Sequence, residues 1–190
     1  ILNTETAGII GTGKIARELI RILKGFGMKV LAYDLYPNDS GKAIAEYVDL
    51  DTLYKSCDII TLHTNATAEN HHLIDARAIE TMKPGAVIIN TARGKLIDSD
   101  ALIAGLESGK LGGAALDVLE NENGLYYYDR MGDVIPNPEL AALRAMPNVI
   151  LTDHTAFYTY EDVKSMVRGV LESAAAFAEG SPSRHDVTNR

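Results

Sequence analysis

Cysteine, long apolar runs and excess positive charge are all scarce in this sequence. Of its 190 residues only Cys57 is a cysteine, so no disulfide can form within the chain, and a reducing compartment is indicated. No apolar run long enough to span a membrane and no basic leader is present, so the sequence gives no sign of membrane insertion or export. The formal net charge of -8 argues against non-specific binding to nucleic acid or anionic membranes, which reward clustered Lys and Arg. A small, locally recognised ligand is therefore favoured.

What the sequence has instead is an alternation of short apolar runs and amphipathic stretches. This alternation is typical of βαβ units wound into a parallel sheet. We expect an α/β fold with a doubly wound parallel sheet of six strands, a Rossmann fold, with helices on both faces. The six predicted strands are residues 7–10, 29–33, 58–63, 86–91, 114–118 and 149–152.

Helices are predicted where apolar residues recur three and four positions apart. The clearest follows Gly13 and ends near Gly25, and a long C-terminal helix begins at Thr159 and ends near Gly180. Shorter helices are expected around residues 52–56, from 76 to 82 and from 98 onward. Residues 120–146 are expected to form a long connection, and loops of that length are usually functional.

The stretch Gly-Ile-Ile-Gly-Thr-Gly-Lys-Ile-Ala at residues 8–16 predicts a turn that binds a dinucleotide. Gly11 lets the chain turn out of a strand, Gly13 leaves room for a pyrophosphate, and Ala16 keeps the helix close to the sheet. Unpaired N–H groups at the helix N-terminus favour the phosphates. Because such turns are common, the match by itself also fits a purely structural turn.

Asp34 favours the ligand-binding interpretation of this turn. It ends the second predicted strand about 20 residues after the glycines, where a carboxylate can accept hydrogen bonds from an adenosine ribose. A carboxylate at this position repels a 2′-phosphate and no arginine is adjacent, so NAD is favoured over NADP. The alternative is an acidic turn residue without a ligand.

Further polar residues follow the later strands, where ligands of open parallel sheets bind. Arg93 follows the fourth strand; its guanidinium can hold a carboxylate and polarise a carbonyl, and the small Gly94 lets a ligand come close. An ion-paired surface arginine is the alternative. Asp117 and Glu122 follow the fifth strand, and His154 follows the sixth. All are expected to face one crevice.

The other four histidines are not expected to take part. His63 also ends a strand, but His71, His72 and His185 lack a spacing typical of metal ligands, so no metal site is predicted. Solvent-exposed or core positions are the favoured interpretation for all four.

An ordered set of motifs resembles the D-isomer-specific 2-hydroxyacid dehydrogenase family, and within it the D-lactate and D-2-hydroxyisocaproate dehydrogenase branch. The motifs span nearly the whole chain and lie at residues 11–13, 90–94, 115–122, 146–150 and 154–159. The resemblance implies an NAD-dependent oxidoreductase that reversibly reduces a 2-oxo acid, such as pyruvate or 2-oxoisocaproate, to the D-2-hydroxy acid. It also implies a homodimer formed through the nucleotide-binding domain. A cytoplasmic location is expected.

By this resemblance Arg93 binds the substrate carboxylate, His154 exchanges the proton, Glu122 pairs with that histidine, and Asp117 lies beside the nicotinamide. Glu120 competes for the role of Glu122, which is preferred for its position relative to Asp117. The catalytic candidates are thus Arg93, Glu122 and His154. The expected NAD-binding residues are Gly11, Thr12, Gly13, Lys14, Ile15, Asp34, Thr64, Asn65, Thr91, Ala92, Arg93, Asp117 and His154.

The sequence departs from the family pattern in three places. Ala16 replaces the third glycine, Thr64-Asn65 stands where Val-Pro is usual, and Asp153 replaces the proline before the histidine. Residues 1–155 are expected to form the NAD-binding domain. Residues 156–190 are expected to form a helix and tail that return toward a substrate domain. The chain starts at an isoleucine, which suggests a fragment from which that domain is largely missing. A non-catalytic NAD(H)-binding redox-sensing module is the alternative function.

Overall fold

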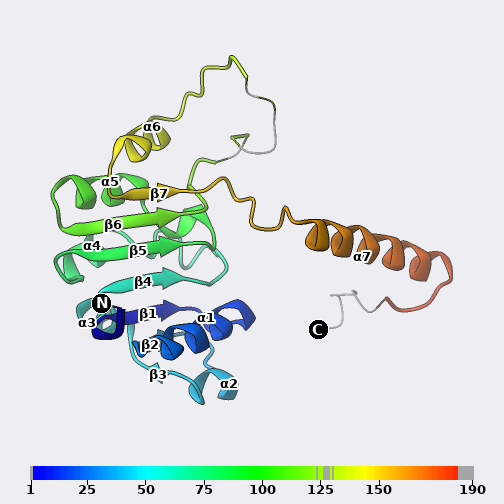
Figure 1. Ribbon diagram of the computed structural model, residues 1–190, viewed down its shortest axis with the longest axis horizontal. Coiled ribbons are helices and arrows are strands. Elements are labelled where there is room, and N and C mark those ends of the chain that lie inside the picture. The colour runs from blue at the N-terminus through cyan, green and yellow to red at the C-terminus, as the bar shows by residue number, and fades with distance from the viewer. Residues whose placement is uncertain (1, 123, 126–128, 130, 184–190) are drawn as a thin grey trace. The chain divides into compact units, whose positions relative to one another are not determined.

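The computed structural model describes residues 2–122, 124–125, 129 and 131–183 (Figure 1). The chain divides into two compact units, residues 1–153 and residues 154–190, and each is described by itself. Within the described residues no helix combines the length and the apolar character needed to cross a membrane.

The first unit is built on one parallel sheet of seven strands in the order β3-β2-β1-β4-β5-β6-β7 (Figure 1). The order reverses between β1 and β4, which is the point where open parallel sheets bind their ligands. The strands are β1 (Thr6–Ile10), β2 (Lys29–Tyr33), β3 (Glu46–Tyr47), β4 (Ile59–Leu62), β5 (Ala86–Asn90), β6 (Leu111–Leu116) and β7 (Val149–Leu151).

All six predicted strands are present, but the predicted number was wrong by one. The additional strand is β3, which pairs with β2 through Leu31 opposite Glu46 and Ala32 opposite Tyr47. A strand of two residues at the edge of the sheet has no apolar run of its own, so the sequence pattern did not reveal it.

Short polar side chains start most of the helices of this unit. Asn38, Asp49, Asp75, Asp98 and Asn137 each accept a hydrogen bond from the N–H three residues further along, which satisfies a donor that the first turn leaves open. The helices are α1 (Lys14–Gly25), α2 (Asp39–Lys42), α3 (Leu50–Ser56), α4 (Ala76–Thr81), α5 (Ser99–Glu107) and α6 (Pro138–Ala145), with 3-10 turns η1 (Leu2–Thr4) and η2 (Gly94–Leu96).

Helix α6 corrects the expectation of an unbroken connection from residue 120 to residue 146. Asn137 caps it and Pro138 occupies its first position, where the missing proline N–H costs nothing. A proline counted as a loop signal is therefore a helix start here.

The helices cover the two faces of the sheet unevenly. The larger core cluster joins one face to side chains of α3, α4, α5 and α6, such as Leu53, Ile79 and Leu102. On the other face Ala16 and Ile20 of α1 pack with residues of β1 and β2. The expectation of helices on both faces is thus met over β1 and β2.

Cys57 directly follows α3 and lies against Gly8 of β1. It is fully buried, and a Cβ added to Gly8 would lie 2.8 Å from its Sγ. Burial raises the pKa of the thiol to about 12. The prediction of a small buried side chain is confirmed.

The described part of the second unit, residues 154–183, contains one long helix, α7 (Tyr160–Ala178). Thr159 caps it, with Oγ1 accepting the N–H of Asp162 at 3.1 Å, as the sequence predicts. None of its described residues is buried, and the apolar side chains of Met166, Val170 and Leu171 are exposed.

Candidate functional site

Gly11 shapes the turn between β1 and α1. Its φ of +91° is a conformation that other residues adopt only under strain, and an added Cβ would lie 2.7 Å from the carbonyl oxygen of His63. Its N–H donates to the carbonyl of Tyr33 at 2.8 Å, which joins the ends of β1 and β2. The predicted turn is confirmed, and glycine is required there for two reasons.

The N-terminus of α1 is open toward solvent. Gly13 precedes the helix, and within the described residues no atom lies within 4 Å of a Cβ added there. In the same described part, no side chain caps the helix and no acidic residue occupies its first turn. Lys14 and Ile15 are exposed, so a phosphate can reach the free N–H groups.

Ala16 occupies the position of the family's third glycine. Its side chain is fully buried and packs with Ile9, Ile20 and Val30. The prediction that Ala16 brings the helix close to the sheet is confirmed.

Asp34 is held by three hydrogen bonds. Oδ2 accepts the N–H and the hydroxyl of Thr12, each at 2.7 Å, and Oδ1 accepts the N–H of Tyr36 at 2.9 Å. The buried Thr12 therefore joins the glycine turn to the end of β2. An ionised carboxylate has about four acceptor sites, so Asp34 keeps capacity for a ligand hydroxyl.

The same contacts keep Asp34 ionised. Partial burial acts to raise its pKa, but the hydrogen bonds from Tyr36 and Thr12 outweigh burial, and the pKa lies below its ordinary value. An ionised carboxylate beside an open helix N-terminus fits a dinucleotide whose ribose lacks a 2′-phosphate.

Tyr47 completes this network and was missed by sequence reasoning. Its hydroxyl donates to Thr12 Oγ1 at 2.8 Å, so that the threonine hydroxyl is free to donate to Asp34. Gly41 makes room for the ring, because a Cβ there would lie 2.1 Å from the Tyr47 oxygen. Nothing in the sequence around the two-residue strand β3 pointed to this role.

The segment after β4 lies beside the glycine turn. His63 donates its N–H to the carbonyl of Ile10 at 2.7 Å, and burial lowers the pKa of its imidazole. Thr64 is half-buried and Asn65 is exposed. Asn70 donates to the Asn65 carbonyl at 2.8 Å, which gives this loop a support other than the usual proline.

Asn90 braces the turn that carries Arg93. The asparagine is buried at the end of β5; its Nδ2 donates to the Arg93 carbonyl at 2.9 Å, and its Oδ1 accepts the N–H of Ala92 at 3.0 Å. Arg93 and Thr91 are exposed, and the guanidinium donates to the Ala92 carbonyl at 2.6 Å. A buried asparagine at a strand end was the signal for this support, and sequence reasoning did not use it.

Gly94 has a different role from the one predicted. A Cβ there would lie 2.0 Å from the carbonyl oxygen of Leu119, so the backbone after β6 fills the space that was expected to admit a ligand. The glycine thereby allows the Arg93 turn to pack directly against the segment that carries Glu120 and Glu122.

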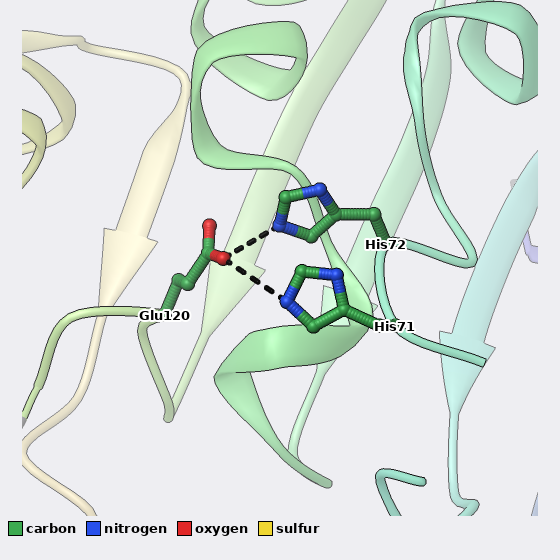
Figure 2. Close-up of side chains that lie close together, drawn as sticks. All are labelled: His71, His72 and Glu120. Atoms are coloured by element: carbon green, nitrogen blue, oxygen red, sulfur yellow. Dashed lines mark hydrogen bonds and ion pairs between the residues drawn. The ribbon is translucent and has the colours of Figure 1, made fainter. Parts of the chain in front are cut away.

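The two glutamates of that segment have different partners. Glu120 Oε1 lies 2.5 Å from His72 Nε2 and 3.7 Å from His71 Nε2 (Figure 2). Glu122 Oε2 accepts the N–H of Leu119 at 2.7 Å. Glu120 is therefore engaged in a separate cluster.

Asp117 directly follows β6, next to the Arg93 turn. Its N–H donates to the Asn90 carbonyl at 2.9 Å, and its carboxylate accepts the hydroxyl of Thr152, which follows β7. The glycine turn, Asp34, Arg93, Asp117 and Glu122 thus follow the carboxyl ends of β1, β2, β5 and β6.

His154 begins the second unit. Its φ is 53°, a left-handed conformation that is uncommon for residues other than glycine but is enriched for histidine. The preceding Asp153 ends the first unit and is exposed. The pairing of His154 with Glu122 stays a prediction.

Comparison with known proteins agrees with this arrangement. Residues 1–156 match the family model described as D-isomer specific 2-hydroxyacid dehydrogenase, NAD binding domain. The chain is 49% identical over 180 residues to a D-lactate dehydrogenase of Leuconostoc mesenteroides, covering 94% of this chain and 54% of that protein. It is 46% identical over 177 residues to an aromatic 2-oxoacid reductase of Clostridium sporogenes, covering 93% of this chain and 54% of that protein.

A solved structure shares both the fold and the extent of the match. The D-lactate dehydrogenase of Lactobacillus jensenii, determined with NAD+, superimposes with a TM-score of 0.90 at 35% identity, covering 98% of this chain and 56% of that one. The chain thus spans about half the length of the relatives it matches. It belongs to the D-isomer specific 2-hydroxyacid dehydrogenase family, and residues 1–156 match that family's NAD-binding domain.

Proposed function

We propose that this chain supplies the NAD-binding and proton-transfer half of an enzyme that reversibly reduces 2-oxo acids to D-2-hydroxy acids. The observation that supports this most strongly is the close packing of the Arg93 turn on the segment after β6. Gly94 permits that contact and Asn90 joins both segments through its backbone and side chain. The Arg93 guanidinium, which can bind a carboxylate, and the acids Asp117 and Glu122 therefore lie at the same edge of the sheet as the glycine turn.

The cofactor is held by residues of the turn and the neighbouring loops. The free N–H groups after Gly13 receive the phosphates and Asp34 receives the adenosine ribose. Lys14, Ile15, Thr64, Asn65, Thr91 and Ala92 line the same path. When bound, the nicotinamide supplies or accepts the hydride.

The chain's own residues bind the substrate and move the proton. Arg93 holds the substrate carboxylate and stabilises the negative charge that grows on the carbonyl oxygen. His154 donates a proton to that oxygen in reduction and takes it back in oxidation. Glu122 orients the imidazole; the engagement of Glu120 with His71 and His72 supports Glu122 in this role.

The activity is tested on the complete parent protein with pyruvate, 2-oxoisocaproate and phenylpyruvate, by following NADH consumption. Replacing His154→Gln is expected to lower turnover by a factor on the order of 10² to 10⁴ while NADH binding, followed by its fluorescence, is retained. Unchanged turnover would remove His154 from the mechanism. NADH binding by the wild-type protein without turnover of any 2-oxo acid would favour the redox-sensing alternative.

We propose a homodimer in the cytoplasm as the functional form. The support for dimerisation is the family resemblance, and the support for the location is the absence of an intrachain disulfide in a chain with one cysteine. Sedimentation of the complete protein measures the first, and fractionation of the source cells measures the second.

A further inference from the structure

His71, His72 and Glu120 form a cluster that the proposed reaction does not use (Figure 2). The histidines lie between β4 and α4, and Glu120 follows β6, 48 residues after His72. Each side chain offers one ligand atom, and these atoms all lie within 4.8 Å of one another. Figure 2 shows both imidazoles turned toward the same carboxylate oxygen.

We propose that this cluster binds a divalent transition-metal ion, for which Zn²⁺ is the best fit. Two imidazole nitrogens and one carboxylate oxygen are ligands that zinc prefers, whereas Mg²⁺ and Ca²⁺ favour oxygen alone. Zinc binds such atoms at about 2.0 to 2.2 Å, so tetrahedral ligands lie about 3.4 Å apart. The separations from Glu120 Oε1, 2.5 Å to His72 and 3.7 Å to His71, lie on either side of that value.

Polar side chains lie behind two of the three ligands. The other ring nitrogen of His72, Nδ1, faces Asp98 Oδ2 at 3.7 Å, and Ser99 Oγ donates to Glu120 Oε2 at 3.5 Å. A carboxylate behind a histidine is the usual support of a zinc ligand. Asp98 is itself fixed, because its Oδ1 accepts the N–H of Ala101 at the start of α5.

The backbone at His72 also suits a fixed ligand. Its φ is 52°, a conformation that costs free energy for a residue with a side chain, and its N–H donates to the Lys95 carbonyl at 2.9 Å. The His71 side chain is 48% exposed, which gives an ion and its water ligands access to the cluster.

A histidine–glutamate hydrogen bond explains only part of this geometry. That bond needs His72 alone, yet the ring of His71 lies with its centroid 3.9 Å from that of His72 and its Nε2 faces the same oxygen. A cation at this point uses all three side chains.

The test uses the complete parent protein without a histidine-containing tag, freed of metal by a chelator. Titration with Zn²⁺ in a calorimeter gives the stoichiometry and affinity, and Co²⁺ in its place reports the ligand set by its visible absorption. We expect His71→Ala to remove one equivalent of tight Zn²⁺ binding per chain. Asp98→Asn keeps the oxygen that caps α5 and should weaken binding by about 10- to 100-fold.

His63→Gln is the matched control, because His63 directly follows β4 and its ring faces Thr61 Oγ1 at 3.0 Å. This variant should bind Zn²⁺ like the wild-type protein. Equal stoichiometry and affinity in the wild-type and His71→Ala proteins would overturn the proposal. Far-UV circular dichroism of the metal-free proteins verifies that each variant is folded.

Discussion

At the scale of single residues, the acid proposed to bind the adenosine ribose depends on a side chain outside the recognised motif. Asp34 is positioned by Thr12, and Thr12 is positioned by Tyr47 from an edge strand. The spacing of Asp34 from the glycines predicted its place, because both lie on one βαβ unit. Tyr47 could not be predicted, because its contact depends on where the chain returns to the sheet after α2.

Replacing Tyr47→Phe should weaken NADH binding by about 2- to 10-fold, the effect of losing one hydrogen bond of about 0.5 to 1.5 kcal/mol. Without the tyrosine donor, the Thr12 hydroxyl is less firmly directed at Asp34. Fluorescence titration with NADH measures the change. Tyr54→Phe is the control, since it loses a hydroxyl that donates to the Leu73 carbonyl at 3.2 Å, away from the glycine turn. Equal affinities for all three proteins would show that Tyr47 has no positioning role.

Replacing Asp58→Asn should lower the free energy of unfolding at pH 7 by about 1 kcal/mol. Asp58 accepts the N–H of Thr6 and the ammonium of Lys83, each at 2.8 Å. Partial burial acts to raise its pKa, but these contacts outweigh burial and lower the pKa. The stabilisation is therefore complete above the unfolded pKa, and the difference between the proteins should shrink as the pH falls below about 4.

Denaturant unfolding at several pH values measures this difference. Asp51→Asn is the control, because Asp51 is an exposed partner of Lys55 at 3.9 Å, and such pairs contribute no more than about 0.5 kcal/mol. A difference for Asp58→Asn that persists unchanged at pH 2 would contradict the assignment.

At the scale of elements, long apolar runs were predictable and short or capped segments were not. The strands around Ile9, Ile60 and Ile88 are buried and show in the sequence as apolar runs, because both faces of a parallel sheet are covered. Strand β3 is too short for such a pattern. The start of α6 was not predicted because Pro138 was interpreted as a loop residue. Gly94 packs on Leu119, and the two residues lie in segments far apart in sequence. Their contact could therefore be recognised only in the folded structure.

Replacing Gly94→Ala should destabilise the protein by about 1 to 3 kcal/mol, because the new Cβ meets backbone atoms that cannot rotate away. The Arg93 turn and the Glu122 segment must move apart to admit the new Cβ. The kcat/KM of the folded variant should therefore fall by more than the loss of folded protein explains. Thermal unfolding and the kcat/KM for pyruvate measure the two effects. Gly25→Ala is the matched control: in the described residues nothing lies within 4 Å of its added Cβ, and a helical alanine is neutral or stabilising. Equal behaviour of the two variants would refute the close contact.

At the scale of the whole molecule, the proposed ligand site extends across the boundary where the strand order reverses. The glycine turn and Asp34 follow β1 and β2, while Arg93 and Asp117 follow β5 and β6. The family match and the motifs made this arrangement predictable within residues 1–153. The place of His154 relative to these groups stays a prediction.

NADH at about 100 times its Kd should stabilise the folded state by about 2.7 kcal/mol, which corresponds to a rise in Tm on the order of 5 °C. NADPH at the same concentration should give a smaller rise, because the ionised Asp34 repels a 2′-phosphate. Scanning calorimetry of the complete protein with each nucleotide measures both. Equal shifts for NADH and NADPH would contradict the role of Asp34.

Because Cys57 is buried, the rate at which its thiol reacts reports local opening of the structure around it. Its thiol, held protonated by burial and covered where α3 meets Gly8, can react with a disulfide reagent only after the helix lifts from the sheet. The rate of its modification under native conditions thus counts the openings of α3, without any introduced probe. For the same reason a second cysteine placed on the surface can be labelled selectively while Cys57 is left in place.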